Sequence, residues 1–239
     1  MSVPVGEPMN MFNVKEKARS RKRRLLRLPE YTLGEEITNA VTHGLGALLA
    51  LCALLAIIFS GPKTTLAATS LSVYGVSMFL LYLVSCLYHA LAVNRAKKVF
   101  QVLDHCTVYV LIAGTYTPIS LLSIGGAEGI FLTSFVWGVS ILAIILNAVD
   151  MRRFRVFSMI CYIALGWCVI FFFRVLLESV DTRSLIFLVT GGILYTVGAI
   201  LYGLGRTHRY MHSVWHVFCL GGSFFHFLVV WQICLAHSV

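Results

Sequence analysis

The chain is a series of long apolar segments separated by short polar breaks. A helix that crosses a lipid bilayer needs about 20 mostly apolar residues, and seven segments of this sequence meet that requirement. The breaks carry turn residues or charge, as in Gly61-Pro62-Lys63 and Gly125-Gly126. Because these connections are short, neighbouring spans are predicted to be antiparallel. The predicted spans cover approximately residues 37–60, 66–93, 100–124, 129–149, 157–177, 185–205 and 211–236.

Composition excludes the main alternatives to a membrane protein. Of the 239 residues, 59% are hydrophobic and 12% are charged, and the mean hydropathy is +0.85. A soluble domain has about 25% charged residues, so this chain lacks the polar surface of a disordered protein or an ordinary soluble enzyme. The sequence therefore predicts an all-α, polytopic protein of the cell membrane. A basic tail over residues 1–32 precedes a seven-transmembrane helical bundle over residues 33–239.

The basic residues predict how the bundle is oriented. Eight of the 19 lysines and arginines lie in the tail, and eight more lie in the second, fourth and sixth connections, which share one side of the membrane. The positive-inside rule makes this side cytoplasmic, so the N-terminus is predicted inside and the C-terminus outside. The connections on the opposite side hold only Lys63 and Arg183. The eight basic residues in the cytoplasmic connections are Arg95, Lys97, Lys98, Arg152, Arg153, Arg155, Arg206 and Arg209.

The net charge of +9 has two explanations that the sequence leaves open. The basic run over residues 17–24 lies next to the first span, where attraction to anionic lipid contributes about 1 kcal/mol per basic residue. The same residues also suffice as a topology signal alone. Both interpretations make membrane lipids the expected partners, and neither requires nucleic acid.

Polar side chains gather at one depth of the predicted bundle. Ser85 and His89 lie near the cytoplasmic end of the second span, and Asp104 lies in the first turns of the third. His212 and His216 lie in the first turns of the seventh span. A charged group at the bilayer centre costs at least about 2.5–3.5 kcal/mol, so polar residues inside spans indicate function. These five residues are therefore the main candidates for a site.

The spacing of these residues predicts a metal centre. Residues four apart share a face of an α-helix, so His212 and His216 point the same way. Two imidazoles from one span and one, from His89, on another supply the three protein ligands of a catalytic zinc site, with the fourth position left to water. Asp104 is then the candidate base for that water, and Ser85 is the candidate donor to an oxyanion. Haem between paired histidines is an alternative, but a nearby carboxylate favours zinc.

Three residues of the first span are further candidates for lining the site. Glu36, Asn39 and His43 form a stripe along one face of the predicted helix, and this stripe either lines the site or bonds another helix. Glu35 stands three residues after Thr32 in the pattern of a capping box, so it is assigned to the start of the helix.

Other features of the spans are assigned structural roles. His105 is rotated by about 100° from Asp104 on the helix, so it is not a predicted ligand. His226 lies deeper in the membrane than the polar layer and is interpreted as an interhelical hydrogen-bonding group. Residues 115–118 end in a proline and predict a kink in the third span.

At these residues the sequence resembles the hemolysin III family, the mostly bacterial relatives of the progestin and adipoQ receptors. The wider superfamily of seven-span proteins is described as metal-dependent membrane hydrolases and includes alkaline ceramidases. The resemblance runs from about residue 33 to the C-terminus. Its motifs are residues 36–44 in the first span, Ser85 with His89, the pair Asp104-His105, residues 114–118, and His212 with His216.

The resemblance implies zinc held by His89, His212 and His216, with roles for Asp104 and Ser85 around the metal-bound water. It does not select one reaction. The ceramidase relatives cleave a lipid amide, the receptors are described as sensing extracellular ligands, and the hemolysin name records a cytolytic phenotype.

The sequence thus predicts a zinc-dependent membrane hydrolase that acts on a lipid-like amide or ester reaching the site from within the bilayer. The alternative is a non-enzymatic protein of membrane homeostasis, or a receptor-like protein, whose zinc is structural. A cytolysin is the third hypothesis. It is less favoured because a pore needs a polar lining along several spans, whereas the polar residues here lie at one end.

Overall fold

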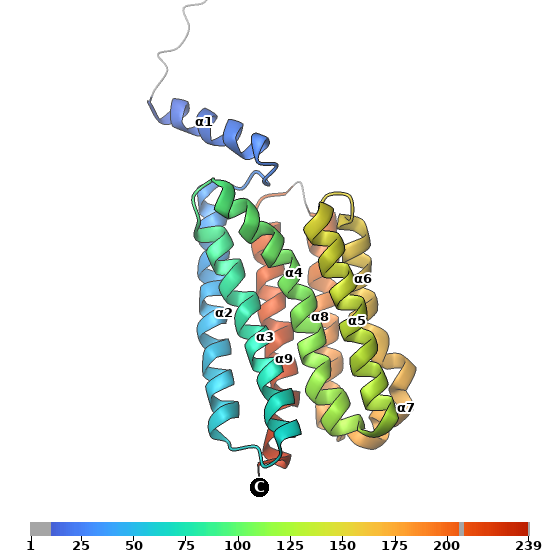
Figure 1. Cartoon of the computed structure of the whole chain (residues 1–239). Helices are drawn as coiled ribbons and strands as arrows, with labels where there is room; N and C mark the ends of the chain where they lie inside the picture. The colour runs from blue at the N-terminus through green and yellow to red at the C-terminus, as the bar shows by residue number, and fades with distance from the viewer. Residues whose placement is uncertain (1–10, 206–207, 239) are drawn as a thin grey trace, which may run out of the picture.

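The computed structural model describes residues 11–205 and 208–238, and in these ranges the chain is helical, without a β-strand (Figure 1). Seven segments of the described chain are helices long and apolar enough to cross a membrane, which confirms the predicted number of spans. They are α2 (Leu33–Phe59), α3 (Thr65–Ala90), α4 (Arg95–Pro118) with η1 (Ile119–Ile124), α5 (Gly126–Asp150), α6 (Arg155–Trp167) with η2 (Cys168–Phe172) and α7 (Phe173–Ser179), α8 (Thr182–Leu204), and α9 (Met211–Ala236).

The outer faces of these spans are apolar. Large side chains such as Leu49, Phe135 and Ile145 are exposed on the outside of the bundle. A water-soluble protein rarely exposes so much contiguous apolar surface, whereas lipid tails solvate it without cost. The chain is therefore a multi-pass membrane protein.

Helix α9 lies in the middle of the bundle. It packs against α2, α3, α4 and α8, so four other spans surround it (Figure 1). Sequential spans run antiparallel, as the short connections predict. Side chains that α9 directs away from lipid can consequently meet residues from α2 on one side and from α4 and α8 on the other.

The basic connections share one end of the bundle. Those between α3 and α4, α5 and α6, and α8 and α9 all lie at the end that carries α1, and the C-terminus lies at the opposite end (Figure 1). Arg206, one of the predicted cytoplasmic residues, lies outside the described residues. Which membrane face this end meets stays a prediction from the positive-inside rule.

Part of the basic tail forms a helix that the sequence analysis did not predict. Helix α1 (Met11–Leu25) lies across the end of the bundle at an angle to the spans (Figure 1). Lys17, Arg21, Lys22 and Arg24 are exposed, whereas Arg19 is half-buried and Arg23 is buried. The tail therefore includes a structured element that contacts the bundle.

The starts of several spans follow the capping rules. The side chain of Thr32 accepts a hydrogen bond from the amide of Glu35, whose carboxylate accepts one from the amide of Thr32 in return. This arrangement confirms the predicted capping box. Thr64, Asn94 and Asp181 cap α3, α4 and α8 in a similar way.

Two spans contain irregular segments. Directly after Pro118, the third span continues as the π-type helix η1, so the predicted irregularity around residues 115–118 takes the form of a wider turn. The fifth span changes to a 3-10 helix over Cys168–Phe172, a break that the sequence analysis did not predict. Both irregular segments contribute residues to the internal cavity described below.

Gly114 marks a close approach of α3 and α4. A Cβ atom at this position would lie 2.8 Å from the Cβ of Ser77, so we expect Gly114→Ala to lower the free energy of unfolding by about 1–3 kcal/mol through overpacking. Gly138 on α5 has no neighbouring atom within 4 Å of the same virtual Cβ, so Gly138→Ala is the matched control. Thermal unfolding in detergent measures both, and equal stability of the two variants would contradict the close approach.

Candidate metal centre

Three histidine side chains from two helices converge at the end of the bundle near α1. His89 comes from the last turn of α3, and His212 and His216 come from the first two turns of α9. The Nε2 atom of His212 lies 3.1 Å from Nε2 of His89 and 3.1 Å from Nε2 of His216. The spacing of four residues thus directs both α9 rings toward one point. The predicted histidine triad is assembled in the structure and could hold a metal ion.

The hydrogen bonds behind the rings determine which ring nitrogens carry protons. The Nδ1 atom of His89 lies 2.9 Å from a carboxylate oxygen of Glu36, which only accepts, so Nδ1 donates. The hydroxyl of Thr42 donates to carbonyl oxygens one turn back in α2. Its oxygen therefore accepts from Nδ1 of His216, 3.2 Å away. Both histidines consequently present the Nε2 lone pair to the centre of the cluster.

This arrangement of lone pairs fits a cation. If Nε2 of His212 carried a proton, it could make a good hydrogen bond to only one of the two neighbouring Nε2 lone pairs, those of His89 and His216. The other ring nitrogen of His212, Nδ1, is buried and has no partner among the described residues. A metal ion accepts all three lone pairs at once. Zinc–nitrogen distances of about 2.0–2.1 Å imply nitrogens about 3.3 Å apart in a tetrahedral site. The two pairs that include His212 are 3.1 Å apart, and all three ligand nitrogens lie within 4.8 Å of one another.

The polar stripe of α2 supports the ligands from behind. Asn39 accepts a hydrogen bond of 2.6 Å from the hydroxyl of Ser213, next to His212 in α9. The ring of His43 stacks on the ring of His216 with centroids 3.4 Å apart and an angle of 11° between the planes. The sequence left open whether this stripe lines the site or bonds other helices. Glu36 and Asn39 make hydrogen bonds to α3 and α9. His43 stacks on α9 and lines the adjacent cavity.

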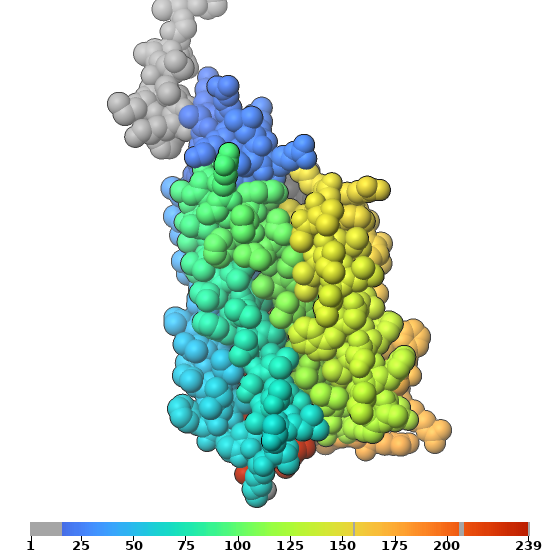
Figure 2. All heavy atoms as spheres, in the orientation of Figure 1, coloured from blue at the N-terminus to red at the C-terminus, as the bar shows by residue number. Residues whose placement is uncertain are grey.

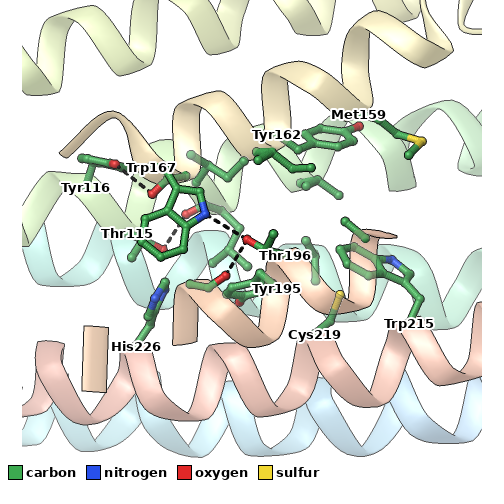
Figure 3. Close-up of a pocket in the computed structure, with 18 of the residues that line it drawn as sticks. Thr115, Tyr116, Met159, Tyr162, Trp167, Tyr195, Thr196, Trp215, Cys219 and His226 are labelled. Atoms are coloured by element: carbon green, nitrogen blue, oxygen red, sulfur yellow. Dashed lines mark hydrogen bonds between the residues drawn. The ribbon is translucent and has the colours of Figure 1, made fainter. Parts of the chain in front are cut away.

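A cavity of about 330 Å³ begins at the cluster and extends along the inside of the bundle. Figure 3 shows its side chains between α6 on one side and α8 and α9 on the other, with Trp167 donating a hydrogen bond of 2.9 Å to Thr196. Ile170 and Phe173 line the cavity and are also exposed, so the cavity comes close to the outer surface at the fifth span. Most of the remaining lining is apolar, including Leu111, Ile163, Leu176, Leu188 and Ala199.

Asp104 and Ser85 line the same cavity as His212 and His216. The carboxylate of Asp104 is not part of the nitrogen cluster, which consists of histidines alone. Ser85 has a buried hydroxyl with no hydrogen-bond partner among the described residues. The two predicted catalytic side chains therefore share a cavity with two histidines of the cluster, and the carboxylate of Asp104 lies 3.9 Å from Nδ1 of His105.

The histidines that the sequence assigned to structural roles have such contacts. His105 bonds the carbonyl oxygen of Gln101 one turn earlier, at 2.9 Å. The ring of His226 lies 3.2 Å from the carbonyl oxygen of Leu188 in α8, which confirms its prediction as an interhelical hydrogen-bonding group.

Sequence reasoning missed three residues of the site. Arg23 and Lys97 both pair with Glu36, and Thr42 holds His216. Lys97 was counted only as a topology signal, and Arg23 only as part of the basic run that marks topology or attracts anionic lipid. The signal that could have found them is the carboxylate of Glu36 inside a span, because a buried charge needs an opposite charge nearby. Thr42 lies within the motif over residues 36–44 but was given no role, since threonine is common in membrane helices.

One residue outside the spans covers the cluster on the side of α1. Tyr31, in the linker between α1 and α2, stacks on the ring of His212 with centroids 5.2 Å apart. Burial raises the pKa of Tyr31 well above its usual value, so its phenol stays neutral. The linker thus covers the ring of His212 on the side of α1.

Comparison with known proteins places these residues in a family. A profile of the family described as Haemolysin-III related matches residues 31–227. The chain is 43% identical to Hemolysin-3 of Bacillus cereus over 198 residues, which cover 82% of this chain and 90% of that protein. It is 38% identical to a Hemolysin-3 homolog of Bacillus subtilis, with coverage of 86% and 97%. It is 21% identical to the human Monocyte to macrophage differentiation factor, with coverage of 67% and 68%.

The cluster predicts that metal binding depends on each imidazole. We expect purified wild-type protein to carry close to one divalent ion per chain and His216→Ala to lose it, because two nitrogens bind far more weakly than three. Elemental analysis measures the metal content. His226→Ala, which removes a histidine of the same helix outside the cluster, should keep the metal. Metal-free wild-type protein after purification without chelator would contradict the prediction.

Thr42 tests the hydrogen bond that holds His216. Thr42→Val removes the acceptor for Nδ1 at nearly constant volume, and outer-shell partners of this kind contribute about 10–100-fold to metal affinity. Thr38→Val, one turn earlier, removes a hydroxyl that bonds only a carbonyl of its own helix and should leave affinity unchanged. Competition with a chromogenic chelator measures both variants. Equal affinities would show that Thr42 does not orient the ligand.

Proposed function

The chain belongs to the haemolysin III-related family, and we propose that it is a zinc-dependent membrane hydrolase of a lipid-like amide or ester. The observation that carries this proposal is the position of the His89, His212 and His216 cluster at the head of an apolar cavity. Three protein ligands are the number found in catalytic zinc sites, which keep one position open. A structural site is usually closed by four ligands, and the described residues bring only three together.

In the proposed hydrolysis, the ion and the side chains of the cavity have different roles. A divalent ion held by the three imidazoles would act as a Lewis acid and lower the pKa of water at the site. Asp104 takes a proton from the attacking water and returns it to the leaving nitrogen or oxygen as the carbonyl bond to that atom breaks. The products are a carboxylic acid and an amine or alcohol. Ser85 donates a hydrogen bond to the carbonyl oxygen as negative charge develops there.

The cavity supports a lipid-like substrate. Its head is polar, with Asp104 and Ser85, and its remaining lining is mostly apolar. Such a lining suits an acyl chain, which would place its carbonyl group near the cluster. The exposure of Ile170 and Phe173 gives a route of entry from the hydrocarbon region. Membrane lipids are therefore the proposed partners.

The second candidate is a metal with a structural role, in a homeostatic or receptor-like protein. It is favoured by the position of the cluster, which joins the end of α3 to the start of α9. A cytolytic pore is less consistent with the structure, because the interior below the cluster is lined mainly by apolar side chains.

Asp104 separates hydrolysis from a structural role. Asp104→Asn keeps the shape of the side chain and the three imidazoles, so we expect zinc content to stay the same. Turnover should fall by about 10²–10⁴-fold, the usual contribution of an acid–base group. Released fatty acid from N-acyl amide and acyl ester lipids, measured by mass spectrometry, is the readout. Asp150→Asn, at the exposed end of α5, is the control and should retain turnover.

Each result has a defined meaning for the proposal. Wild-type turnover in Asp104→Asn would overturn the role of this carboxylate. No fatty acid from any amide or ester probe with zinc-loaded wild-type protein, together with a lower unfolding temperature of His216→Ala, would favour the structural role.

A further inference from the structure

Helix α1 contacts the bundle through one buried arginine. Figure 2 shows α1 on the end of the bundle next to the connection between α3 and α4, and Figure 1 shows it lying across that end. Arg21, Lys22 and Arg24 are exposed, whereas Arg23 is 1% exposed. Burying a guanidinium is costly unless it is paired, so the contact requires a specific partner inside the bundle.

That partner is Glu36 in the first turn of α2. One nitrogen of Arg23 lies 2.5 Å from Oε1 of Glu36, and another donates to the carbonyl oxygen of Pro29 at 2.5 Å. Glu36 is itself buried. Lys97 Nζ lies 3.1 Å from both carboxylate oxygens and also donates to the carbonyl oxygen of Tyr88 at 2.7 Å. Residues from α1 and α4 thus hold one carboxylate.

The held carboxylate acts on the metal centre. While Arg23 binds Oε1, the other oxygen of Glu36 accepts the Nδ1 proton of His89 at 2.9 Å. This bond fixes the ring so that Nε2 faces the other two imidazoles. Carboxylates that bind the distal nitrogen of a metal-ligating histidine orient the ring and raise its basicity.

The linker after α1 reinforces this connection. Leu28 is buried against Tyr88 and Val93, which stand on either side of the end of α3. Tyr31 then covers the ring of His212. The segment that carries Arg23 therefore contacts both helices that supply ligands.

We propose that α1 is a control element of the metal centre, which its docking aligns through Arg23, Glu36 and His89. Glu36 and Arg23 are positioning residues in this scheme, since neither belongs to the nitrogen cluster. Docked α1 keeps Glu36 oriented toward His89. Undocking of α1 removes the Arg23 contact, so that the carboxylate, still paired with Lys97, is free to turn from the ring. The inference deepens the proposed function, on whose metal site it rests.

The test measures metal affinity in the full-length protein. We expect Arg23→Gln to weaken Co²⁺ and Zn²⁺ binding by about 10–100-fold, measured by competition with a chelator. Its matched control is Arg21→Gln, an exposed arginine of the same helix, which should bind both ions as wild type does. The d–d absorption of the Co²⁺ form reports coordination geometry and should change in Arg23→Gln, which loss of stability alone would not cause. Arg23→Lys, which retains the charge, should recover part of the affinity.

A second variant decides the matter if Arg23→Gln does not fold. Leu28→Ala loosens the docking of α1 without touching the ion pairs, so it should also weaken metal binding. If Arg23→Gln binds the metal ions with wild-type affinity, the inference is overturned, while the proposed hydrolysis is unaffected. If Arg23→Gln is unfolded, wild-type metal affinity in Leu28→Ala has the same meaning. Normal metal binding without lipid turnover would overturn the proposed hydrolysis alone. A wild-type chain that binds neither ion would overturn both.

Discussion

The structure depends on one constraint, which is that polar groups inside a bilayer must find their partners within the protein. The carboxylate of Glu36 shows how this constraint organises the bundle. Its partners Arg23, His89 and Lys97 come from α1, α3 and α4, so satisfying one buried charge connects four helices. Removing one member of a buried ion pair typically costs about 3–5 kcal/mol. The same contacts that stabilise this end of the bundle also orient a histidine of the metal centre.

The central position of α9 brings its two histidines next to both the polar contacts of α2 and α3 and the internal cavity. Because α9 is surrounded by other spans, His212 and His216 meet α3 and α2 on one side and a cavity on the other. The lining of the cavity is mostly apolar, with polar side chains at the end near the cluster and also deeper, as at Thr196. The chain belongs to the haemolysin III-related family, and its three-nitrogen cluster could hold a metal ion. The hydroxyl of Ser85, which has no hydrogen-bond partner among the described residues, lines the same cavity.

Much of this arrangement could be predicted because the signals were local or periodic. Span length and hydropathy depend on consecutive residues, and the capping box of Thr32 and Glu35 spans four positions. The spacing of His212 and His216 is a property of one helix. The convergence of His89 with them was predicted from depth alone, since depth follows from position along a span. The break in the fifth span and the helical form of the tail carried no comparable signal.

The sequence by itself determined the number of spans, the level of the polar residues and the type of side chain at the candidate site, because hydrocarbon solvent imposes a strong local rule on composition. Only the tertiary structure decided which residues hold the histidine rings in place. Arg23 and Thr42 reach the site from segments distant in sequence, through packing that places α1 and α2 against the histidines. Such contacts depend on how helices rotate and cross, and these angles are set jointly by all the packed side chains. No single segment encodes them.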